Sequence, residues 1–340
     1  MDLTLDQEQE AIRDAIRAML QQHASIEGLR KRFVGGDVFD PSLWARAAEL
    51  GWFGLATPEA HGGSGYGLPE AMLLFTELGQ ALTPGPWLGS VVAAQALAAG
   101  DALGGVLAGR TRVALIDDPT DQLGSGAVVR GQVGAVAGAE VADAWLVLGS
   151  RAVRWVDRGA TVAIVTNPSV DPTRPLSVVR FDDVPATVLA DDAITVRQAA
   201  TVLVSAEAVG VAERALQLSV EYAKVRVQFG KPIGSFQAIK HRCADMAVRV
   251  EVARSSTIWA AVAVRDGAAD AGAHCHAAKA LAAHAAFQNA TDSIQNHGGM
   301  GYTWEADPHL YLKRARLLEL ALGSRTHHLD ALAAAWRAAV

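Results

Sequence analysis

Two segments of this sequence combine residue types that suit the binding of a nucleotide. In the first, residues 222–237, Arg226 offers a planar guanidinium that can hold a pyrophosphate through charge-assisted hydrogen bonds. In the second, residues 295–302, three glycines let the backbone approach a phosphate and point N–H groups at it. The aromatic ring of Phe229 and the side-chain amide of Gln237 suit an adenine or a ribose. The candidate binding residues are Arg226, Phe229, Gln237, Gln295, Gly298 and Gly299.

Each segment also has a simpler structural interpretation. Arg226 alone would be a solvated charge at a helix end, and the glycines alone would be a helix C-cap followed by a turn. The combination argues against both interpretations, because the spacing from Arg226 to Phe229 and Gln237, and from Gln295 to the glycines, must otherwise arise by chance.

Two other clusters do not point to a ligand. Neighbouring residues on a helix point about 100° apart and i,i+2 residues about 200° apart, so His274, Cys275 and His276 cannot converge on a metal ion. The glycine-rich run at residues 62–65 lacks the Lys-Ser/Thr pair that a nucleotide phosphate loop requires, and we interpret it as a turn. We therefore predict no metal site.

Composition excludes several classes of protein. The 340 residues carry a net charge of −6 and are 51% hydrophobic, with no large basic cluster, so nucleic acid is not an expected partner. The N-terminus has no basic segment followed by an apolar one, and no run approaches eighteen uninterrupted apolar residues. Both cysteines lie in helical sequence. We expect a cytoplasmic, reduced protein with no membrane partner.

Hydrophobic periodicity divides the chain into three domains. Residues 1–110 show the 3.6-residue period of amphipathic helices, interrupted by a glycine-rich connection at 50–67. Residues 111–192 carry short β-branched or aliphatic runs separated by turn residues, which predicts a small β domain. Residues 193–340 return to long helical segments, at roughly 200–226, 236–266 and 269–296 and then 305–322 and 324–338, which predicts an antiparallel bundle. The two candidate segments both belong to this last domain.

The order of domains and several motifs resemble the acyl-CoA dehydrogenase family over nearly the whole chain. Its first-domain signature is similar to residues 50–55, 58–65 and 77–79, and its middle strands are similar to residues 141–147 and 181–185. The most specific likeness is the arginine, Phe-Gly-Lys-Pro and Phe-Gln of the first segment, with Gln-x-x-Gly-Gly-x-Gly about sixty residues later. The resemblance implies an N-terminal helical domain, a middle β barrel and a C-terminal four-helix bundle. It also implies FAD, an acyl-CoA substrate, oxidation of its α,β-carbon bond, and electron-transfer flavoprotein as acceptor.

The chain departs from this family where the catalytic base belongs. A family member usually carries a glutamate in a C-terminal Glu-Gly-Thr motif, and the matching place here is Leu322. Other members place the glutamate in the first long C-terminal helix, where this chain has Ala200. Neither side chain can accept a proton, so we name no catalytic residue. Glu207 and Glu319 lie nearby at different helical phases, and Glu319 is the candidate for a relocated base.

The flavin-ring half of the family's site is depleted as well. The segments that hold the ring in self-sufficient members read Ile116-Asp-Asp-Pro-Thr-Asp-Gln-Leu-Gly124 and Val133-Gly-Ala-Val-Ala-Gly138 here, and they have lost most aromatic and hydroxyl groups. In the family each flavin crosses a subunit interface, its ring on one chain and its adenosine diphosphate arm on the neighbour. This chain therefore resembles the short, base-lacking subunits of heterotetrameric acyl-CoA dehydrogenases of steroid side-chain degradation.

Three hypotheses follow. The first is a subunit that completes the FAD site of a homologous partner carrying the catalytic glutamate, in an α2β2 assembly with two active sites. The second is a self-sufficient homo-oligomeric FAD acyl-CoA dehydrogenase that uses Glu319 as its base. The third is a flavin-free structural or regulatory relative. The sequence does not identify the acyl group, because specificity depends on pocket shape.

Overall fold

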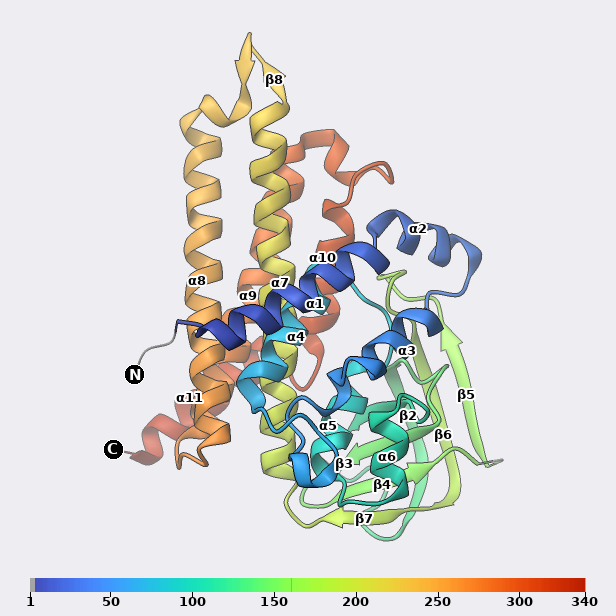
Figure 1. Cartoon of the computed structure of the whole chain (residues 1–340). Helices are drawn as coiled ribbons and strands as arrows, with labels where there is room; N and C mark the ends of the chain where they lie inside the picture. The colour runs from blue at the N-terminus through green and yellow to red at the C-terminus, as the bar shows by residue number, and fades with distance from the viewer. Residues whose placement is uncertain (1–3, 160, 340) are drawn as a thin grey trace. The chain divides into compact units, whose positions relative to one another are not determined.

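The computed structural model describes residues 4–159 and 161–339 (Figure 1). Contacts within it divide the chain into two compact units. One contains the described residues up to Ile26, the segment Met72–Thr83 and the chain from Thr201 onward, and the other contains Glu27–Ala71 and Pro84–Ala200. The division of the sequence into residues 1–110, 111–192 and 193–340 stays a prediction.

The N-terminal region is helical, as its periodicity predicts. The first helix begins after Asp6, whose carboxylate accepts from the backbone N–H of Gln9 while the Gln9 side chain accepts from the N–H of Asp6, forming a capping box. The connection at 50–67 contains two short 3-10 turns before the next helix begins at Leu68. The elements are α1 (Gln7–His23), α2 (Ile26–Gly35), α3 (Pro41–Glu49), η1 (Trp52–Gly54), η2 (Glu59–His61), α4 (Leu68–Gln80), α5 (Trp87–Ala96) and α6 (Asp101–Leu107).

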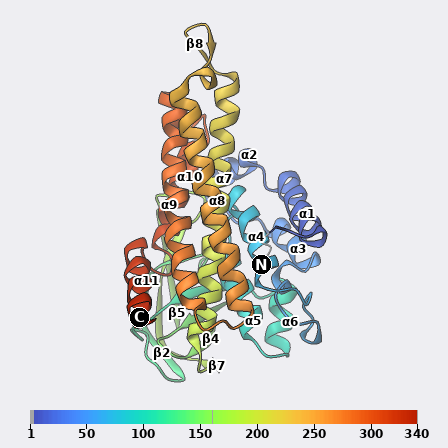
Figure 2. The same ribbon diagram turned by 90° about the vertical axis from the view of Figure 1, so that its left-hand side faces the viewer.

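Three long helices dominate the C-terminal region and lie side by side in both views (Figures 1 and 2). They are α7 (Ala193–Val225), α8 (Gln237–Arg265) and α9 (Ala271–His297), and a hairpin of β8 (Val227–Gln228) and β9 (Lys231–Pro232) connects the first two. The helix α9 packs against α8, α10 (Pro308–Leu320) and α11 (Arg325–Ala339). Short 3-10 turns, η3 (Ile233–Ser235) and η4 (Gly298–Tyr302), precede α8 and follow α9.

Among the described residues, α7 is the helix long and apolar enough to cross a membrane. Its most apolar stretch is 72% buried inside the protein. That burial is typical of a core helix, which passes the same test of length and composition.

Glycines bring α4 and α7 unusually close together. A Cβ atom built on Gly210 of α7 would lie 1.9 Å from the carbonyl oxygen of Thr76, and one built on Gly79 of α4 would lie 2.2 Å from the carbonyl oxygen of Glu207. Real Cβ contacts do not occur at such distances, so each helix needs a glycine where it meets the backbone of the other. This crossing determines where α7 runs through the helical unit.

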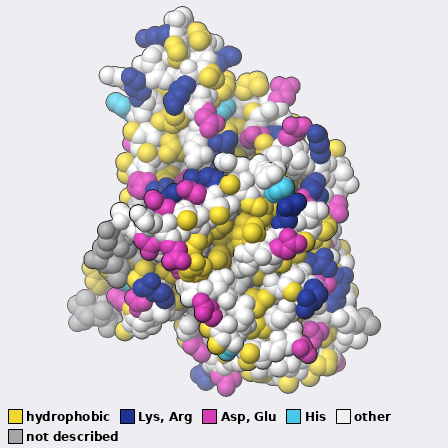
Figure 3. Space-filling view, viewed as in Figure 1, with side chains coloured by type: hydrophobic (Ala, Val, Ile, Leu, Met, Phe, Trp, Pro, Cys, Tyr) yellow, Lys and Arg dark blue, Asp and Glu magenta, His cyan; other side chains and the backbone are white. Residues whose placement is uncertain are grey.

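A network of polar and charged side chains connects the helices of the same unit. Arg17 of α1 donates to both carboxylate oxygens of the buried Glu77 of α4, at 3.1 and 2.7 Å. Arg254 of α8 makes two hydrogen bonds to a single oxygen of Glu213 of α7, at 3.0 and 2.6 Å. The side-chain amide of Gln80 donates to Glu213 at 2.9 Å and to Glu77 at 3.5 Å, which links the two pairs. Burial raises the pKa of Glu213 even though Arg254 opposes that change. Figure 3 shows acidic and basic side chains mixed over the face in view.

The β domain consists of two open sheets rather than the closed barrel expected from the family resemblance. The first sheet has the order β1-β3-β4-β7, with β1 and β3 parallel and the other pairs antiparallel, and the second has the order β2-β6-β5. No ladder joins the two sheets among the described residues; a shared hydrophobic core does so instead. The strands are β1 (Val113–Asp117), β2 (Val128–Ala137), β3 (Ala144–Leu148), β4 (Val153–Asp157), β5 (Val162–Asn167), β6 (Leu176–Pro185) and β7 (Thr187–Ala190).

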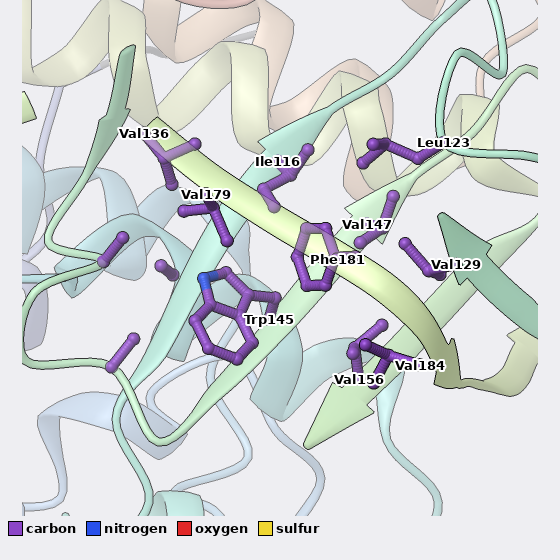
Figure 4. Close-up of a cluster of buried hydrophobic side chains, with 13 residues drawn as sticks. Ile116, Leu123, Val129, Val136, Trp145, Val147, Val156, Val179, Phe181 and Val184 are labelled. Carbon is purple, nitrogen blue, oxygen red and sulfur yellow. The ribbon is translucent and has the colours of Figure 1, made fainter. Parts of the chain in front are cut away.

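Figure 4 shows the core that joins the sheets. Trp145 of β3 and Phe181 of β6 meet edge to face, with ring centroids 5.5 Å apart, and both side chains are fully buried. Valines and an isoleucine from both sheets surround them. The helical N- and C-terminal regions and this small β domain confirm the predicted fold class.

The α4–α7 crossing yields a prediction for stability. Gly210→Ala should destabilise the protein by about 1–3 kcal/mol, because a methyl group 1.9 Å from a backbone oxygen must push the helices apart. Thermal and urea denaturation of both proteins would measure the loss. The matched control is Gly104→Ala in the exposed part of α6, where a Cβ meets nothing within 4 Å and alanine should stabilise. Equal stability of Gly210→Ala and the parent would show that the crossing relaxes freely.

Candidate functional site

A cavity of about 550 Å³ lies where α7 and α9 end and α8 begins. Five of the six candidate residues line it: Arg226, Phe229, Gln295, Gly298 and Gly299. The sixth, Gln237, is the exposed first residue of α8 and does not line the cavity. Its assignment to the ligand stays a prediction.

The hairpin after α7 positions Arg226 and Phe229. The N–H of Arg226 makes the last helical hydrogen bond to the carbonyl of Tyr222, and its carbonyl accepts from the N–H of Ile233 beyond the hairpin. Phe229 and Gly230 form the two-residue turn, with φ angles of 51° and 80°, the left-handed pair that a tight hairpin needs. Glycine adopts that conformation without cost, whereas phenylalanine is strained in it and its side chain is 92% exposed.

The three positions after α9 carry glycine for different structural reasons. Gly298 has φ 60° and ψ −141°, a conformation open to glycine almost alone. Gly301 is excluded from carrying a side chain by packing, because a Cβ there would lie 2.7 Å from the carbonyl oxygen of Ile294. A Cβ on Gly298 or Gly299 would meet nothing within 4 Å, so the space above their backbone is open to a ligand.

Sequence reasoning missed several residues of the cavity. Tyr222 and His297 stack with ring centroids 4.2 Å apart, and Phe236 and Ile239 add apolar surface. Gln228, Ile233, Asn296 and Met300 complete the lining. All lie within or beside the two candidate segments, but only the folded chain shows which of their side chains face the cavity. An exposed guanidinium, open glycine backbone and apolar or aromatic surface suit a nucleotide pyrophosphate and its base.

The loop between β1 and β2 satisfies its own polar groups. The carboxylate of Asp118 accepts from the N–H groups of Gln122 and Leu123 at 2.7 and 3.0 Å and faces the fully buried Arg154. Asp121 accepts from the N–H of Ser150, and Arg197 binds Asp117 at 2.8 Å. The family resemblance implies a ring-binding segment at this place in the sequence. Here the three carboxylates bind the loop itself, the connection after β3, Arg154 of β4 and Arg197 of α7.

The turn between α10 and α11 holds no carboxylate at Leu322, which has a left-handed φ of 57°. The buried Lys279 of α9 donates to the carbonyls of Glu319 and Gly323 at 3.1 and 3.3 Å. Burial lowers the pKa of Lys279 to about 8. The carbonyl of Leu322 accepts from Nε2 of His328 at 2.9 Å. The turn is therefore held by side chains of α9 and α11.

A second histidine extends this contact. Nδ1 of His276 lies 2.9 Å from Nδ1 of His328. Because Nε2 of His328 donates to a carbonyl, its neutral ring presents Nδ1 as an acceptor, and His276 must be the donor. Burial is the main cause that lowers the pKa of His328 to about 4, and it also lowers the pKa of His276.

The other carboxylates considered from the sequence take part in ion pairs. Glu207 is buried and accepts from Arg314 at 2.8 Å, and Glu319 accepts from Arg316 at 2.6 Å on its own helix. Ala200 is fully buried in α7. Neither of the two positions named for a base, 200 and 322, presents a group that could take up a proton.

Comparison with known proteins identifies the family. The sequence matches the acyl-CoA dehydrogenase N-terminal domain over residues 6–107 and the C-terminal domain over residues 198–336. It is 36% identical over 327 residues to the acyl-CoA dehydrogenase IpdE2 of Mycobacterium tuberculosis, covering 92% of each chain. The chain belongs to the acyl-CoA dehydrogenase family. The fold and family expected from the sequence are thus confirmed.

Further acyl-CoA dehydrogenases share the similarity. The acyl-CoA dehydrogenase FadE34 of the same bacterium is 36% identical over 368 residues, which cover the whole of this chain but 49% of FadE34. Among solved structures, the ChsE4-ChsE5 complex of M. tuberculosis has a TM-score of 0.88 at 27% identity, covering 98% of both chains. A structure described as the Tcur3481-Tcur3483 steroid ACAD, in a G363A variant, has a TM-score of 0.87 at 27% identity, covering 99% of this chain and 100% of that one.

The histidine contact yields a prediction of pH dependence. The folded pKa of His328 lies below its ordinary value of 6.5, so the unfolded chain binds more protons between pH 6.5 and about 4. The contribution of neutral, buried His328 to the stability of the fold is complete above pH 6.5. It is lost as the pH falls, and the free energy of unfolding decreases by at most about 1.4 kcal/mol per pH unit from this group. Urea denaturation from pH 8 to 4.5 should therefore show a shallower loss for His328→Phe than for the parent.

The exposed neighbour provides the control for this measurement. His327→Gln should keep most of the parent's pH dependence, since His327 is exposed and, although its ring packs against His328, its charge is the smallest of the causes that lower the pKa of His328. Identical slopes for the parent and His328→Phe would contradict the interpretation.

Proposed function

We propose that this chain is one subunit of a hetero-oligomeric FAD-dependent acyl-CoA dehydrogenase. It holds the adenosine diphosphate arm of the flavin, and a homologous partner chain supplies the ring contacts and the catalytic glutamate. The observation that carries the proposal is the asymmetry of the chain itself. The cavity at Arg226 and the glycines is formed, whereas Leu322 and Ala200 stand where relatives carry the base.

The comparisons support a partner of the same family. Two similar structures at 27% identity are named as pairs of proteins, ChsE4-ChsE5 and Tcur3481-Tcur3483. This chain matches only about half of the length of FadE34. The other half of that polypeptide is long enough for a second unit of similar size. A separate partner chain would correspond to that second unit in an α2β2 assembly.

The residues of this chain would then act on the cofactor and not on the substrate carbon. Bound FAD supplies the acceptor for the hydride that leaves the β-carbon of the acyl thioester. Arg226 would offset the charge of the pyrophosphate, and the open backbone at Gly298 and Gly299 would allow its close approach. Phe229 would pack on the flavin from its exposed hairpin. Proton abstraction would belong to the partner.

The substrate we propose is an acyl-CoA thioester whose acyl group is the side chain of a steroid, in line with the steroid ACAD among the similar structures. Electron-transfer flavoprotein is the proposed acceptor, and the cytoplasm the proposed compartment. The alternative, a self-sufficient enzyme that uses Glu319, requires that carboxylate to leave Arg316 and reach a substrate.

Flavin stoichiometry tests the proposal. Co-expression with a longer homologous chain that carries the glutamate should yield a complex with about one FAD per pair of unlike chains, because each site needs both halves. The absorbance of the flavin band against protein mass gives the ratio. One FAD per polypeptide, or a yellow and active protein when this chain is expressed alone, would favour the self-sufficient enzyme.

Arg226→Ala tests the contribution of this chain to the site. Loss of charge-assisted hydrogen bonds should cost about 1.5–3 kcal/mol per bond, enough to release FAD from the complex on dilution while the subunits stay assembled. Flavin fluorescence after gel filtration measures the release. Arg265→Ala is the control, because Arg265 lies at the other end of α8, beside Asp266. Full retention of flavin by Arg226→Ala would show that the arginine is only a surface charge.

A further inference from the structure

His297 has a fixed orientation in the cavity. It is the last residue of α9, and its Nδ1 lies 2.7 Å from the carbonyl oxygen of Ser293. A carbonyl only accepts, so Nδ1 carries the hydrogen, and Nε2 is the nitrogen left for a ligand. Stacking on Tyr222, at an interplanar angle of 22°, further restrains the ring. Neutral His297 can accept at Nε2, whereas protonated His297 donates there.

The C-termini of two helices give the cavity a partial negative charge, so the charge of the His297 ring affects the binding of an anion. Both α7 and α9 reach the cavity with their C-termini, where free carbonyl groups give a partial negative charge. An anion is repelled there unless cations offset that charge. Within the described lining of the cavity, the side chains that can carry a positive charge are Arg226 and His297. Arg226 is always charged, so His297 is the group whose charge can change.

The surroundings of His297 leave its protonation open to a ligand. Burial lowers its pKa, and the hydrogen bond to Ser293 and the charge of Asp307, before α10, act in the opposite direction. Tyr222 and Arg226 approach from α7. Arg242 of α8 is engaged by Asn296 and Asp292. A pyrophosphate beside Nε2 would add negative charge and favour the protonated ring.

We propose that His297 is a second, proton-dependent cation of the pyrophosphate site, which takes up a proton when the anion binds. This inference rests on the proposed function and adds a regulation to it: the chain holds the diphosphate arm more tightly as the pH falls. His297 therefore acts as a binding residue whose contribution depends on pH, beside the constant contribution of Arg226.

ADP-ribose is a suitable probe of the site in the full-length protein. Its pyrophosphate is a diester, so the charge of the ligand stays constant between pH 5.5 and 8. Isothermal titration should show the dissociation constant falling as the pH falls, by about tenfold for each unit by which binding raises the pKa of His297. His297→Gln should remove this dependence. Arg226→Ala should weaken binding at every pH and keep the dependence. His241→Gln, an exposed histidine of α8 outside the cavity lining, should behave as the parent.

NMR titration of the imidazole C–H signals provides the direct readout. The pKa of His297 should rise when ADP-ribose saturates the protein, and that of His241 should not. Binding that is independent of pH, with an unchanged pKa of His297, would overturn the inference and leave the proposed function intact. Absence of any binding would overturn the inference as well, and the flavin content of the co-expressed complex would then decide the proposed function separately.

Discussion

The close contact between α4 and α7 is the constraint on which the helical unit depends. At Gly79 and Gly210 each helix lies against the backbone of the other, and side chains of any size would separate them. One turn away, Glu207 is buried in an ion pair with Arg314 of α10. A buried pair repays its desolvation only with good geometry, so breaking either partner leaves an uncompensated charge. The glycines and this pair together determine the position and rotation of α7.

The position of α7 in turn determines the candidate site. Glu213 on its middle section binds Arg254 of α8, and Tyr222 near its end stacks on His297 of α9. Arg226 and the hairpin follow directly. The cavity therefore depends on how two helices end beside the start of a third, and its polar groups come from segments about seventy residues apart in the sequence.

The turn at Leu322 is held by side chains of two helices, α9 and α11. Lys279 satisfies two carbonyls at the end of α10, and His328 satisfies the carbonyl of Leu322 itself. Buried carbonyls need such donors, since an unpaired one costs free energy. The β1–β2 loop is similar, because Asp118 and Asp121 bind backbone groups of the β domain and Asp117 binds Arg197 of α7. Both places are consistent with a subunit whose contribution to the flavin site is one-sided.

Local sequence determined much of this protein. Periodicity located the long helices, and the motifs brought out six candidate residues, five of which line one cavity. The helices depend on interactions between near neighbours, which a sequence displays directly. Tertiary structure decided the rest: the two open sheets instead of a barrel, the stacking of Tyr222 on His297, and the contact of His276 with His328. The absence of Gln237 from the lining of the cavity belongs with them. Each of these depends on how elements distant in sequence pack, and a hydrophobic period gives the face of a helix but not its partner.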